Sequence, residues 1–351
     1  MTTKIRAIGF RSHGGPEVLE ELDLELPAAP PAGTVRIRVL AVALNHLDLW
    51  VRRGLPSLKL PLPHRLGSDI AGQIVALGDG AVAPPPGTRV VLAPGTSCGV
   101  CEACLGGRDN FCRRYHILGE STHGGYGDVL DVPAANLLPW PGTLSPVEAA
   151  AIPLTFQTAW QMVVERAALR AGETMLVHAA GAGVSVAAIQ IGKMLGARVI
   201  VTSTKEEKLA RAKELGADEG ILSTAQDFVA ECRRLTGKAG VDVVVEHLGG
   251  EVFEKSLLAL RNGGRLVTCG ATAGPRPTVD LRHVFFRQLS VLGSTMGSKA
   301  ALYPVLRAVE QGKLRPVVAE VFPMTADGAR GAHPARGGHR VRQARARPLT
   351  Q

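Results

Sequence analysis

The stretch TMLVHAAGAGVSVAAIQIGKMLGARVIVTS, residues 174–203, holds two short apolar runs on either side of a longer apolar segment. The first run, TMLVHAA from Thr174, predicts a buried strand, and RVIVTS from Arg198 predicts a second one. Between them, GAGVS predicts a tight turn and VAAIQIGKMLGA predicts a helix that closes at Gly196. The stretch therefore predicts a strand, a helix and a second strand parallel to the first.

The segment that follows repeats this alternation. Thr204 and Glu207 have capping-box spacing ahead of a helix that is predicted to end at Gly216. Three more strand candidates begin near Val241, Gly264 and Leu289. Strands that alternate with helices predict the α/β fold class, with a doubly wound parallel sheet.

The turn AAGAGVS, from Ala179 to Ser185, lies where such a sheet binds the pyrophosphate of a dinucleotide, because helix N–H groups point there and small residues allow close approach. Ala180, Ala182 and Ser185 stand at the glycine positions of the G-x-G-x-x-G pattern, so the turn alone is a weak signal. A tight turn without a ligand is the alternative. The strands behind the turn favour a dinucleotide site.

The end of the second predicted strand bears on the choice of cofactor. An Asp or Glu there would accept hydrogen bonds from the ribose of NAD, whereas this chain has Ser203 and Thr204, with Lys205 and Lys208 after them. These residues tolerate or favour a 2′-phosphate and predict NADPH. Two glutamates directly after Lys205 keep NADH as the alternative.

Four of the six cysteines lie in residues 97–112 with the spacing C-x2-C-x2-C-x7-C, which suits a tetrahedral Zn(II) bound by four thiolates. Gly99, Gly106 and Gly107 supply tight turns for such a loop. A reduced loop with incidental cysteines is the alternative. Because a four-thiolate zinc has no open coordination position, we expect a purely structural role for Cys98, Cys101, Cys104 and Cys112.

The composition limits the classes of protein. With 351 residues, 46% apolar and 20% charged, the chain is long enough for two globular domains. It has no secretory h-region and no apolar run near the roughly 20 residues that span a bilayer, which predicts a cytoplasmic protein. The net charge of +9 suggests a nucleic-acid binder, but residues 325–351 hold six arginines against one aspartate, a net +5 in the tail alone. We expect neither a nucleic-acid nor a membrane partner.

From residue 4 to about residue 333, the chain resembles the medium-chain dehydrogenase/reductase family of zinc-type alcohol dehydrogenases and quinone reductases. The segments that carry the resemblance are HGGPEVLEELDLELPAAPPAGTVRIRV, ALNHLDLWVRRG, LGSDIAGQIVALG, PGTRVVLAPGTSCGVCEACLGGRDNFC and the cofactor turn. The resemblance implies a Rossmann domain at 153–296 and a GroES-like, mainly-β catalytic domain at 1–152 and 297–333, with the active site in the cleft between them. It also implies the structural zinc, a small-molecule substrate and a homo-oligomer, either dimer or tetramer.

The catalytic zinc of the family's alcohol dehydrogenases is not implied. Those enzymes have a Cys where this chain has Asn45, a Gly-His-Glu where it has Gly67, Ser68 and Asp69, and another Cys near Leu154 or Thr155. The pattern LNHLDLWVRRG instead resembles the zinc-free quinone reductases. Without a Lewis acid, the acceptor is expected to be a quinone, an enone or a related carbonyl compound, whose conjugation spreads the developing negative charge.

The resemblance also implies roles for individual residues. Asn45, Thr158 or a water makes polar contact to the developing enolate, while NADPH supplies the hydride. The residues expected around the cofactor are Ala180, Gly181, Ala182, Gly183, Val184, Ser203, Thr204, Lys208, His247, Leu248, Gly270, Ala271 and Gly293.

Two rival hypotheses remain at this point. His46, His64 and Asp69 lie close in sequence to the lost metal ligands, so they could rebuild a catalytic zinc and give a zinc-dependent alcohol dehydrogenase. A non-enzymatic NADPH-binding protein is the second alternative.

The tail GARGAHPARGGHRVRQARARPLTQ departs from the family, which ends in a helix and a strand of the form G-[KR] followed by apolar residues. Read from the second base of the Pro334 codon, the codons of residues 334–347 can spell LLEEGTGFGKLVLA, and the codon of Gln343 then necessarily gives Lys or Arg. We therefore hypothesise a single-base deletion or sequencing error shortly after His333. It predicts that residues 334–351, as written, form a basic tail without defined structure.

Overall fold

The computed structural model describes residues 2–55, 58–332 and 342–345, the last of these by backbone alone. The chain forms two compact units. Unit 1 comprises Met1–Leu154, Ser298–Glu310 and Arg315–Gln351, and unit 2 comprises Thr155–Gly297 and Gln311–Leu314. The domain boundaries predicted from the sequence lie directly after residues 152 and 296. Within the described residues no helix is both long and apolar enough to cross a bilayer.

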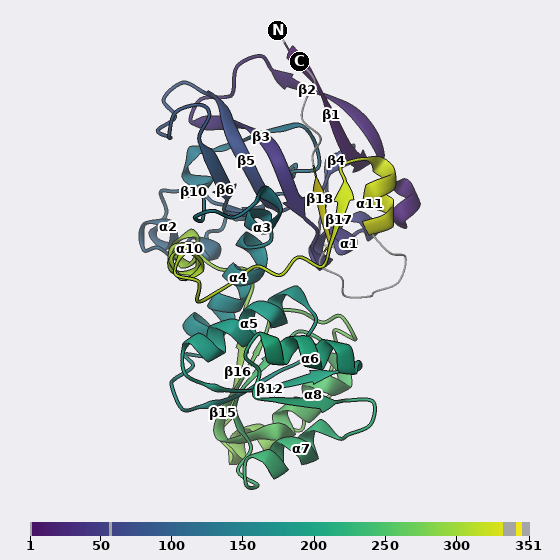
Figure 1. Cartoon of the computed structure of the whole chain (residues 1–351), viewed down its shortest axis with the longest axis vertical. Coiled ribbons are helices and arrows are strands. Elements are labelled where there is room, and N and C mark those ends of the chain that lie inside the picture. Colours follow the sequence, from purple (N-terminus) through teal and green to yellow (C-terminus); the bar gives the residue numbers. More distant parts are fainter. Residues whose placement is uncertain (1, 56–57, 333–341, 346–351) are drawn as a thin grey trace. The chain divides into compact units, whose positions relative to one another are not determined.

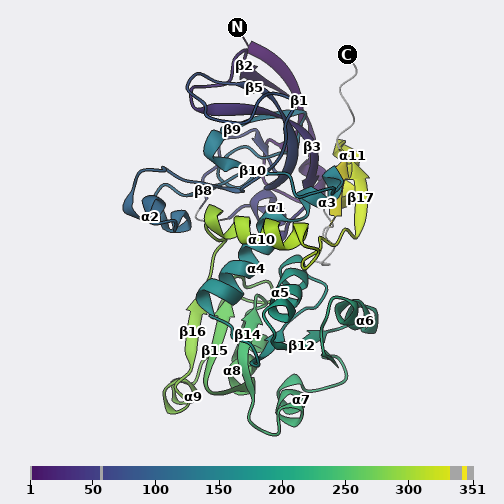
Figure 2. The ribbon, with the colours of Figure 1, turned by 60° about the vertical axis from the view of Figure 1, so that its left-hand side comes forward.

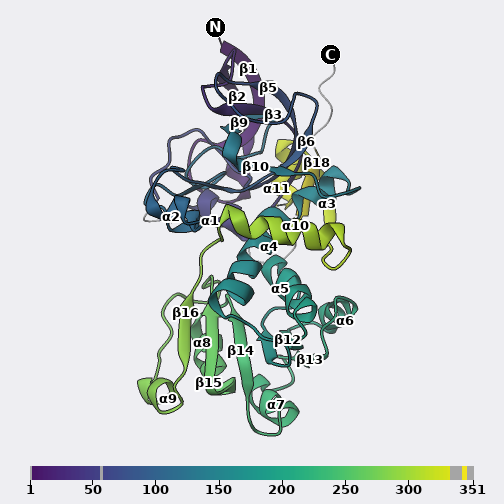
Figure 3. The same cartoon turned by 90° about the vertical axis from the view of Figure 1, so that its left-hand side faces the viewer.

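Unit 2 is built on a parallel sheet whose described strands run in the order β13, β12, β11, β14, β15, β16 (Figure 3). The strands are Thr174–Val177 (β11), Arg198–Ser203 (β12), Glu219–Leu222 (β13), Val241–Glu246 (β14), Leu260–Thr268 (β15) and Ser290–Gly293 (β16). The apolar runs of β11, β12 and β14 are buried almost throughout, as expected for central strands of a parallel sheet covered by helices. The predicted doubly wound sheet is confirmed, and β13 is a strand that the sequence did not predict.

Helices connect the strands of unit 2 (Figure 2). They are α5 (Gly183–Met194), α6 (Glu206–Glu214), α7 (Phe228–Leu235), α8 (Gly250–Ala259) and α9 (Leu281–Phe286). The predicted capping box at α6 is wrong: Lys205 is the N-cap and no side chain caps the helix. Glu207 lies 3.8 Å from the Lys205 ammonium, so its carboxylate pairs with that charge.

Unit 1 is mainly β, and its largest sheet runs β10, β6, β5, β3, β18, β17 within the described residues, with β9 also on β3 (Figure 1). A second sheet has the order β2, β1, β4, and β7 pairs with β8. The strands are Thr2–Phe10 (β1), Glu20–Pro27 (β2), Thr34–Ala43 (β3), His64–Arg65 (β4), Asp69–Leu77 (β5), Arg89–Leu92 (β6), Gly95–Thr96 (β7), His116–Ile117 (β8), Val129–Pro133 (β9), Leu137–Pro139 (β10), Glu320–Pro323 (β17) and Arg342–Arg345 (β18).

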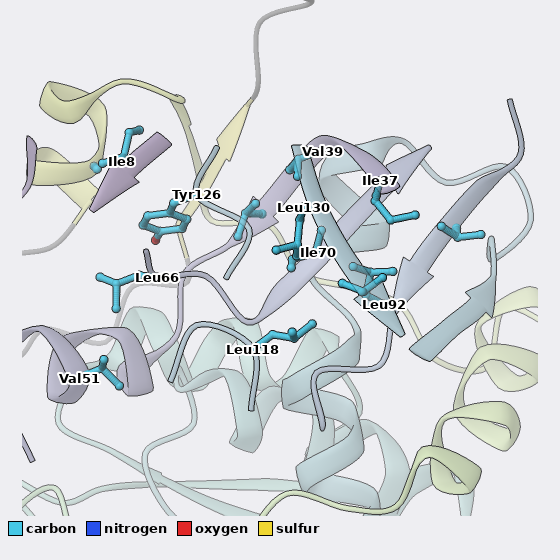
Figure 4. Close-up of a cluster of buried hydrophobic side chains, with 14 of the residues drawn as sticks. Ile8, Ile37, Val39, Val51, Leu66, Ile70, Leu92, Leu118, Tyr126 and Leu130 are labelled. Atoms are coloured by element: carbon cyan, nitrogen blue, oxygen red, sulfur yellow. The ribbon is translucent and has the colours of Figure 1, made fainter. Parts of the chain in front are cut away.

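The core of unit 1 lies against this sheet (Figure 4). Ile37 and Val39 of β3 and Ile70 of β5 are fully or almost fully buried there. The other α-helices that the structure describes are α1 (His46–Arg53), α2 (Glu102–Leu105), α3 (Pro146–Ala150), α4 (Pro153–Trp160), α10 (Leu302–Glu310) and α11 (Ala326–Ala332), and a π-helix spans Gln161–Arg166. Ala329 of α11 belongs to the core, so the returning chain is part of this unit.

The tail differs from its prediction at four residues. Arg342–Arg345 form β18, which pairs parallel with β17 and antiparallel with Ala41–Ala43 of β3. Backbone hydrogen bonds do not depend on side-chain type, so a gap between two strands can be filled even by Arg-Gln-Ala-Arg. The rest of the predicted disordered segment, 334–341 and 346–351, lies outside the described residues.

Candidate functional site

The residues predicted to hold the cofactor gather at one edge of the parallel sheet in unit 2. The turn 179–182 follows β11, Ser203 ends β12, His247 follows β14, Gly270 follows β15 and Gly293 ends β16. The strand order reverses between β11 and β14, which is where open parallel sheets bind ligands beyond their carboxyl ends. The topology therefore brings residues from five parts of the sequence to this edge.

The N-terminus of α5 faces this edge with its N–H groups uncapped by side chains. Ala182 is the N-cap, and it makes no side-chain cap hydrogen bond. Ala179 has a positive φ of 51°, and Ala182 N–H donates to Ala179 O at 2.8 Å, which closes the turn. A twelve-residue helix carries a partial positive charge at such an end, so this turn favours a phosphate group.

Lys208 of α6 lies across the same turn. A Cβ atom added to Gly181 would lie 2.8 Å from Lys208 Cδ and 3.1 Å from its Cε, so the lysine stem packs directly against the glycine. Ser203 is buried at the end of β12, where its Oγ accepts Lys205 N–H at 3.1 Å. A cationic side chain thus lies beside the turn 179–182, and a hydroxyl stands at the strand end where NAD-specific sheets carry a carboxylate.

Ser185 and His247 form a hydrogen bond whose direction can be deduced. Ser185 Oγ lies 2.7 Å from His178 O and 2.9 Å from His247 Nε2. A carbonyl oxygen only accepts, so the hydroxyl donates to it and must accept from His247. His247 therefore carries a proton on Nε2 and links the turn after β14 to the first turn of α5. In the sequence, Ser185 was noted only because it occupies a glycine position of the G-x-G-x-x-G pattern. Nothing in the sequence predicted that its hydroxyl would bind His247.

The protonation of His178 follows from its burial and its hydrogen bonds together. Ser256 Oγ donates to Val252 O, so it accepts from His178 Nε2 at 2.8 Å, and in the neutral ring Nδ1 then accepts from Thr202 Oγ1 at 3.0 Å. Burial lowers the pKa of His178 to about 3, with a smaller contribution from His247. This histidine is a structural link between β11, β12 and α8.

Glu246 shapes the turn that contains His247 and Leu248. Its carboxylate accepts Leu248 N–H at 2.5 Å, Gly249 N–H at 2.6 Å and Thr268 Oγ1–H at 2.8 Å. Burial raises the pKa of Glu246, and these hydrogen bonds oppose the rise. The carboxylate therefore fixes the loop between β14 and α8.

Thr158 is buried in α4, within unit 2, and neighbouring side chains hold the loop after β16. Gln157 Nε2 donates to Gly297 O at 2.9 Å, and Arg166 Nε donates to Gly293 O at 2.8 Å. A Cβ on Gly297 would lie 2.9 Å from the Gln157 backbone oxygen, so only glycine allows this approach. Helix α4 and the π-helix after it thus position residues 293–297.

The four cysteines of unit 1 form a compact cluster. Their sulfur atoms all lie within 4.8 Å of one another, with Cys104 Sγ 3.8 Å from Cys98 Sγ and 3.5 Å from Cys101 Sγ. A tetrahedral zinc with Zn–S bonds of about 2.3 Å needs S···S distances of about 3.8 Å, so the cluster fits that ion. Backbone N–H groups of Val100 and Cys101 lower the pKa of Cys98 to about 5, whereas the pKa of Cys101 is raised to about 11 because the hydrogen bond from the Cys104 backbone is outweighed by the neighbouring sulfur atoms.

The turns of this lobe agree in part with their prediction. Gly99 and Gly107 have positive φ angles of 76° and 70°, whereas Gly106 has a φ of −80° that any residue adopts. The lobe is tied to the returning chain by buried Asp109, which accepts Lys299 N–H at 2.9 Å and lies 3.5 Å from the Lys299 ammonium. Zinc bound to the four cysteines would therefore hold this lobe and its anchor together.

A second polar cluster of unit 1 surrounds Asn45. The Asn45 side-chain amide donates through Nδ2 to Asp69 Oδ2 at 2.8 Å, and Leu154 N–H donates to Asp69 Oδ1 at 2.5 Å. Asp48 accepts Asn45 N–H at 2.7 Å and Gly67 N–H at 3.0 Å. Asn45, Asp48 and Asp69 are all buried. Two carboxylates thus join the start of α1, the start of β5 and the start of α4.

The protonation of these carboxylates is set chiefly by burial. Burial raises the pKa of Asp69 to about 7, against the hydrogen bonds from Asn45 and Leu154 and together with the charge of Asp48. Burial raises the pKa of Asp48 to about 6, which its backbone hydrogen bonds and Arg52 oppose. Both carboxyls therefore titrate close to neutral pH.

With this geometry established, the chain can be compared with known proteins. The profile of the "Alcohol dehydrogenase GroES-like domain" matches residues 31–142, and that of the "Zinc-binding dehydrogenase" matches residues 183–311. The crystal structure of an NAD-dependent alcohol dehydrogenase matches this chain with a TM-score of 0.91 and 52% sequence identity. The match covers 97% of this chain and 99% of that chain.

Two curated relatives carry other names. The quinone oxidoreductase of Homo sapiens is 29% identical over 91% of this chain and 91% of its own length. The acryloyl-coenzyme A reductase of Metallosphaera sedula is 30% identical over 90% of this chain and 92% of its own length. The chain belongs to the medium-chain dehydrogenase/reductase family. It is an NAD(P)-dependent oxidoreductase of the alcohol dehydrogenase and quinone reductase type, which sets aside the non-enzymatic alternative.

The hypothesis of a catalytic zinc rebuilt from His46, His64 and Asp69 finds no support among the described residues. Among the described residues, the four cysteines are the one group of three or more His, Cys, Asp or Glu side chains close enough to share an ion. His64 Nε2 lies 3.2 Å from Gly119 O, His46 packs edge-on against Trp50, and both oxygens of Asp69 are hydrogen-bonded. All three side chains thus have other contacts within unit 1.

Proposed function

We propose that this enzyme transfers hydride from NADPH to a quinone, an enone or a related conjugated carbonyl compound without a catalytic zinc. The observation that carries the proposal is the Asn45–Asp69 hydrogen bond. Asn45 and Ser68 stand where the family's zinc enzymes carry metal ligands, and Asp69 is engaged by Asn45 and by Leu154. The Asn45 amide can offer a hydrogen bond to a substrate, and a carboxylate engaged at both oxygens offers no open metal position.

The chemistry of the acceptor follows from these groups. When hydride adds to a conjugated acceptor, negative charge develops on the carbonyl oxygen and spreads through the conjugated system. We propose either the second N–H of the Asn45 amide or the Thr158 hydroxyl as the donor to that oxygen, because a donor to developing charge stabilises it. The cofactor supplies the hydride, so orientation accounts for most of the remaining rate. The names of the quinone oxidoreductase and the acryloyl-CoA reductase support this class of acceptor.

An acceptor panel tests the proposal. NADPH oxidation is followed at 340 nm with quinones, enones, aldehydes and an acryloyl thioester, and NAD(P)⁺ reduction is followed with alcohols. We expect turnover with the conjugated acceptors and little with simple aldehydes or alcohols. Efficient alcohol oxidation, with conjugated acceptors inert, would favour the alcohol dehydrogenase activity named for the 52% identical structure.

The choice of NADPH rests on Lys208 and Ser203. Lys208 lies against Gly181 of the phosphate turn, and buried Ser203 places no carboxylate at the end of β12. Glu207 pairs with Lys205, which weakens the opposing negative charge. We expect NADPH to bind more tightly than NADH in fluorescence titrations, and Ser203→Asp to reverse the order. Lys208→Met should weaken NADPH binding alone; equal loss for both cofactors would assign Lys208 to the pyrophosphate.

For assembly, we propose a homo-oligomer that uses the outer edge of the parallel sheet. Strand β16 is an edge strand with Val291 46% exposed, and α9 exposes Leu281, Phe285 and Phe286. Unpaired strand groups beside an apolar surface favour pairing with a second copy. Light scattering should give a dimer or tetramer, and Phe286→Glu should reduce it to monomers. A monomeric wild-type protein would contradict this proposal.

We also propose a cytoplasmic location, because four zinc-binding thiols require a reducing compartment.

A further inference from the structure

The carboxylate of Asp69 is the point at which three segments of unit 1 meet. Its Oδ2 holds the Asn45 side chain ahead of α1, its Oδ1 holds the Leu154 backbone in α4, and Asp69 itself opens β5. These are the three places in the sequence where zinc-containing relatives were expected to carry ligands. In this chain a single buried carboxylate connects them.

The hydrogen bond to Asp69 settles how the Asn45 amide is oriented. A carboxylate only accepts, so the group facing it must be the NH2 of Asn45 and not its carbonyl oxygen. One N–H is then committed to Asp69, and the second N–H and Oδ1 have fixed directions. Because Asn45 is buried and its backbone N–H is held by Asp48 at 2.7 Å, the amide has little freedom to turn.

Protonation of Asp69 would weaken this pair of hydrogen bonds. With two accepted N–H bonds, one at each oxygen, a proton added to either oxygen competes with a donor already there. The charges that act on Asp69 are Asp48, which opposes its ionisation, and Arg52, which acts through Asp48. No ion pair found within the described residues includes Asp69. Its protonation therefore depends mainly on burial and on Asp48.

We propose that Asp69 is a positioning residue that orients the Asn45 amide toward the reacting oxygen, and that the enzyme works with Asp69 ionised. The proposal rests on the proposed function, in which Asn45 touches the substrate. Asp69 itself does not touch the substrate. The rate of the reaction then depends on pH through Asp69, a group that takes no direct part in hydride transfer.

The pH profile of kcat/KM tests this role, with NADPH and 1,4-naphthoquinone as the probe pair. Wild-type kcat/KM should rise with pH through an inflection near 7, the pKa of Asp69. Asp69→Asn removes the charge and one acceptor, so it should lower kcat/KM by about tenfold to hundredfold at pH 8 and flatten the profile. Asp48→Asn is the matched control: it should keep the inflection and move it to lower pH, because a like charge is removed.

The outcomes separate this proposal from the proposed function. If Asn45→Ala leaves kcat/KM unchanged, Asn45 does not touch the substrate and the proposed function loses its polar contact. If Asn45→Ala lowers kcat/KM but Asp69→Asn keeps the wild-type profile, Asp69 does not position Asn45. A second readout is independent of turnover: the ¹⁵N side-chain resonance of Asn45, assigned with Asn45→Ala, should shift with an apparent pKa near 7 and lose that shift in Asp69→Asn. A resonance that does not titrate would overturn the proposal.

Discussion

The four-cysteine lobe and the Asn45–Asp69 cluster belong to the same unit, and both connect segments that lie apart in the sequence. In the lobe, sulfur atoms within 4.8 Å of one another suit a divalent cation. In the cluster, a buried carboxylate accepts N–H groups at 2.8 and 2.5 Å. We therefore expect the lobe to depend on a bound metal ion and the cluster to depend on the ionised state of Asp69. Metal removal and pH change should therefore affect different parts of the same unit.

The largest effect is expected in the lobe. Cys112→Ser removes a buried sulfur from the cluster, so zinc should be lost and the free energy of unfolding should fall by roughly 4 kcal/mol or more. Zinc content and thermal unfolding measure both effects. Cys269→Ser is the control, because burial raises the pKa of that thiol to about 12 and it lies outside the cluster. Full zinc retention by Cys112→Ser would show that the lobe is not a four-thiolate site.

The next effect concerns the cluster. Asn45→Ala should lower kcat/KM by about a hundredfold, roughly 3 kcal/mol, because a donor to the developing charge is lost. The dissociation constant for NADPH should stay within about twofold. The control is His46→Ala, which changes the next residue along the chain and should cost less than about threefold. A greater loss for His46→Ala than for Asn45→Ala would return attention to metal ligation at His46.

The returning chain provides a third test, since it joins the same unit at β17 and α11. Replacing residues 334–347 by LLEEGTGFGKLVLA should raise the free energy of unfolding by roughly 2–4 kcal/mol, because Phe, Leu and Val then stand in and beside β18. The control is the unaltered sequence truncated after residue 347, so that both proteins have the same length. The gene itself is the second check: nucleotides that cannot spell the apolar strand in the shifted frame, or no gain in stability, would contradict the frameshift.

The smallest effect is the pH dependence of stability. The folded-state pKa of Asp69, about 7, lies above its unfolded value of 3.8, so its stabilising contribution is full below pH 3.8 and is lost as pH rises through 7. Asp48, at about 6, acts in the same direction. Between pH 5 and 8, Asp69→Asn should therefore gain roughly 1–3 kcal/mol of stability relative to the wild type. Urea unfolding at the two pH values measures this difference, and a constant difference would refute it.

Much of the fold could be predicted from strong local patterns. The runs that begin at Thr174 and Arg198 were correctly predicted as strands, because each is a short series of adjacent apolar residues bounded by a turn. The strand EGIL at 219–222 was missed because it is short and its second residue is glycine, so its pairing with β12 supplies the signal that its sequence lacks. The capping box at Thr204 failed because the helix begins one residue later than its pattern suggested: Lys205 is the N-cap, which puts Glu207 at the second helical position and not the third.

The candidate sites show the same limit. Cysteine spacing is local, so the cluster of four could be predicted from the sequence alone. The hydrogen bond from Leu154 to Asp69 joins residues 85 positions apart and involves a backbone N–H, which leaves no trace in sequence. The Ser185–His247 bond also spans 62 positions. Polar contacts of this kind follow from the packed fold and from no local pattern.

Zinc stoichiometry of the active enzyme tests most directly whether hydride transfer proceeds without a catalytic metal. Elemental analysis should be made on protein purified without chelators and shown to turn over 1,4-naphthoquinone. We predict one zinc per chain, lost on Cys112→Ser and retained in full by Asn45→Ala, Asp69→Asn and His46→Ala. Two zinc ions per active chain, with the second lost on changing Asp69, His46 or His64, would contradict this mechanism.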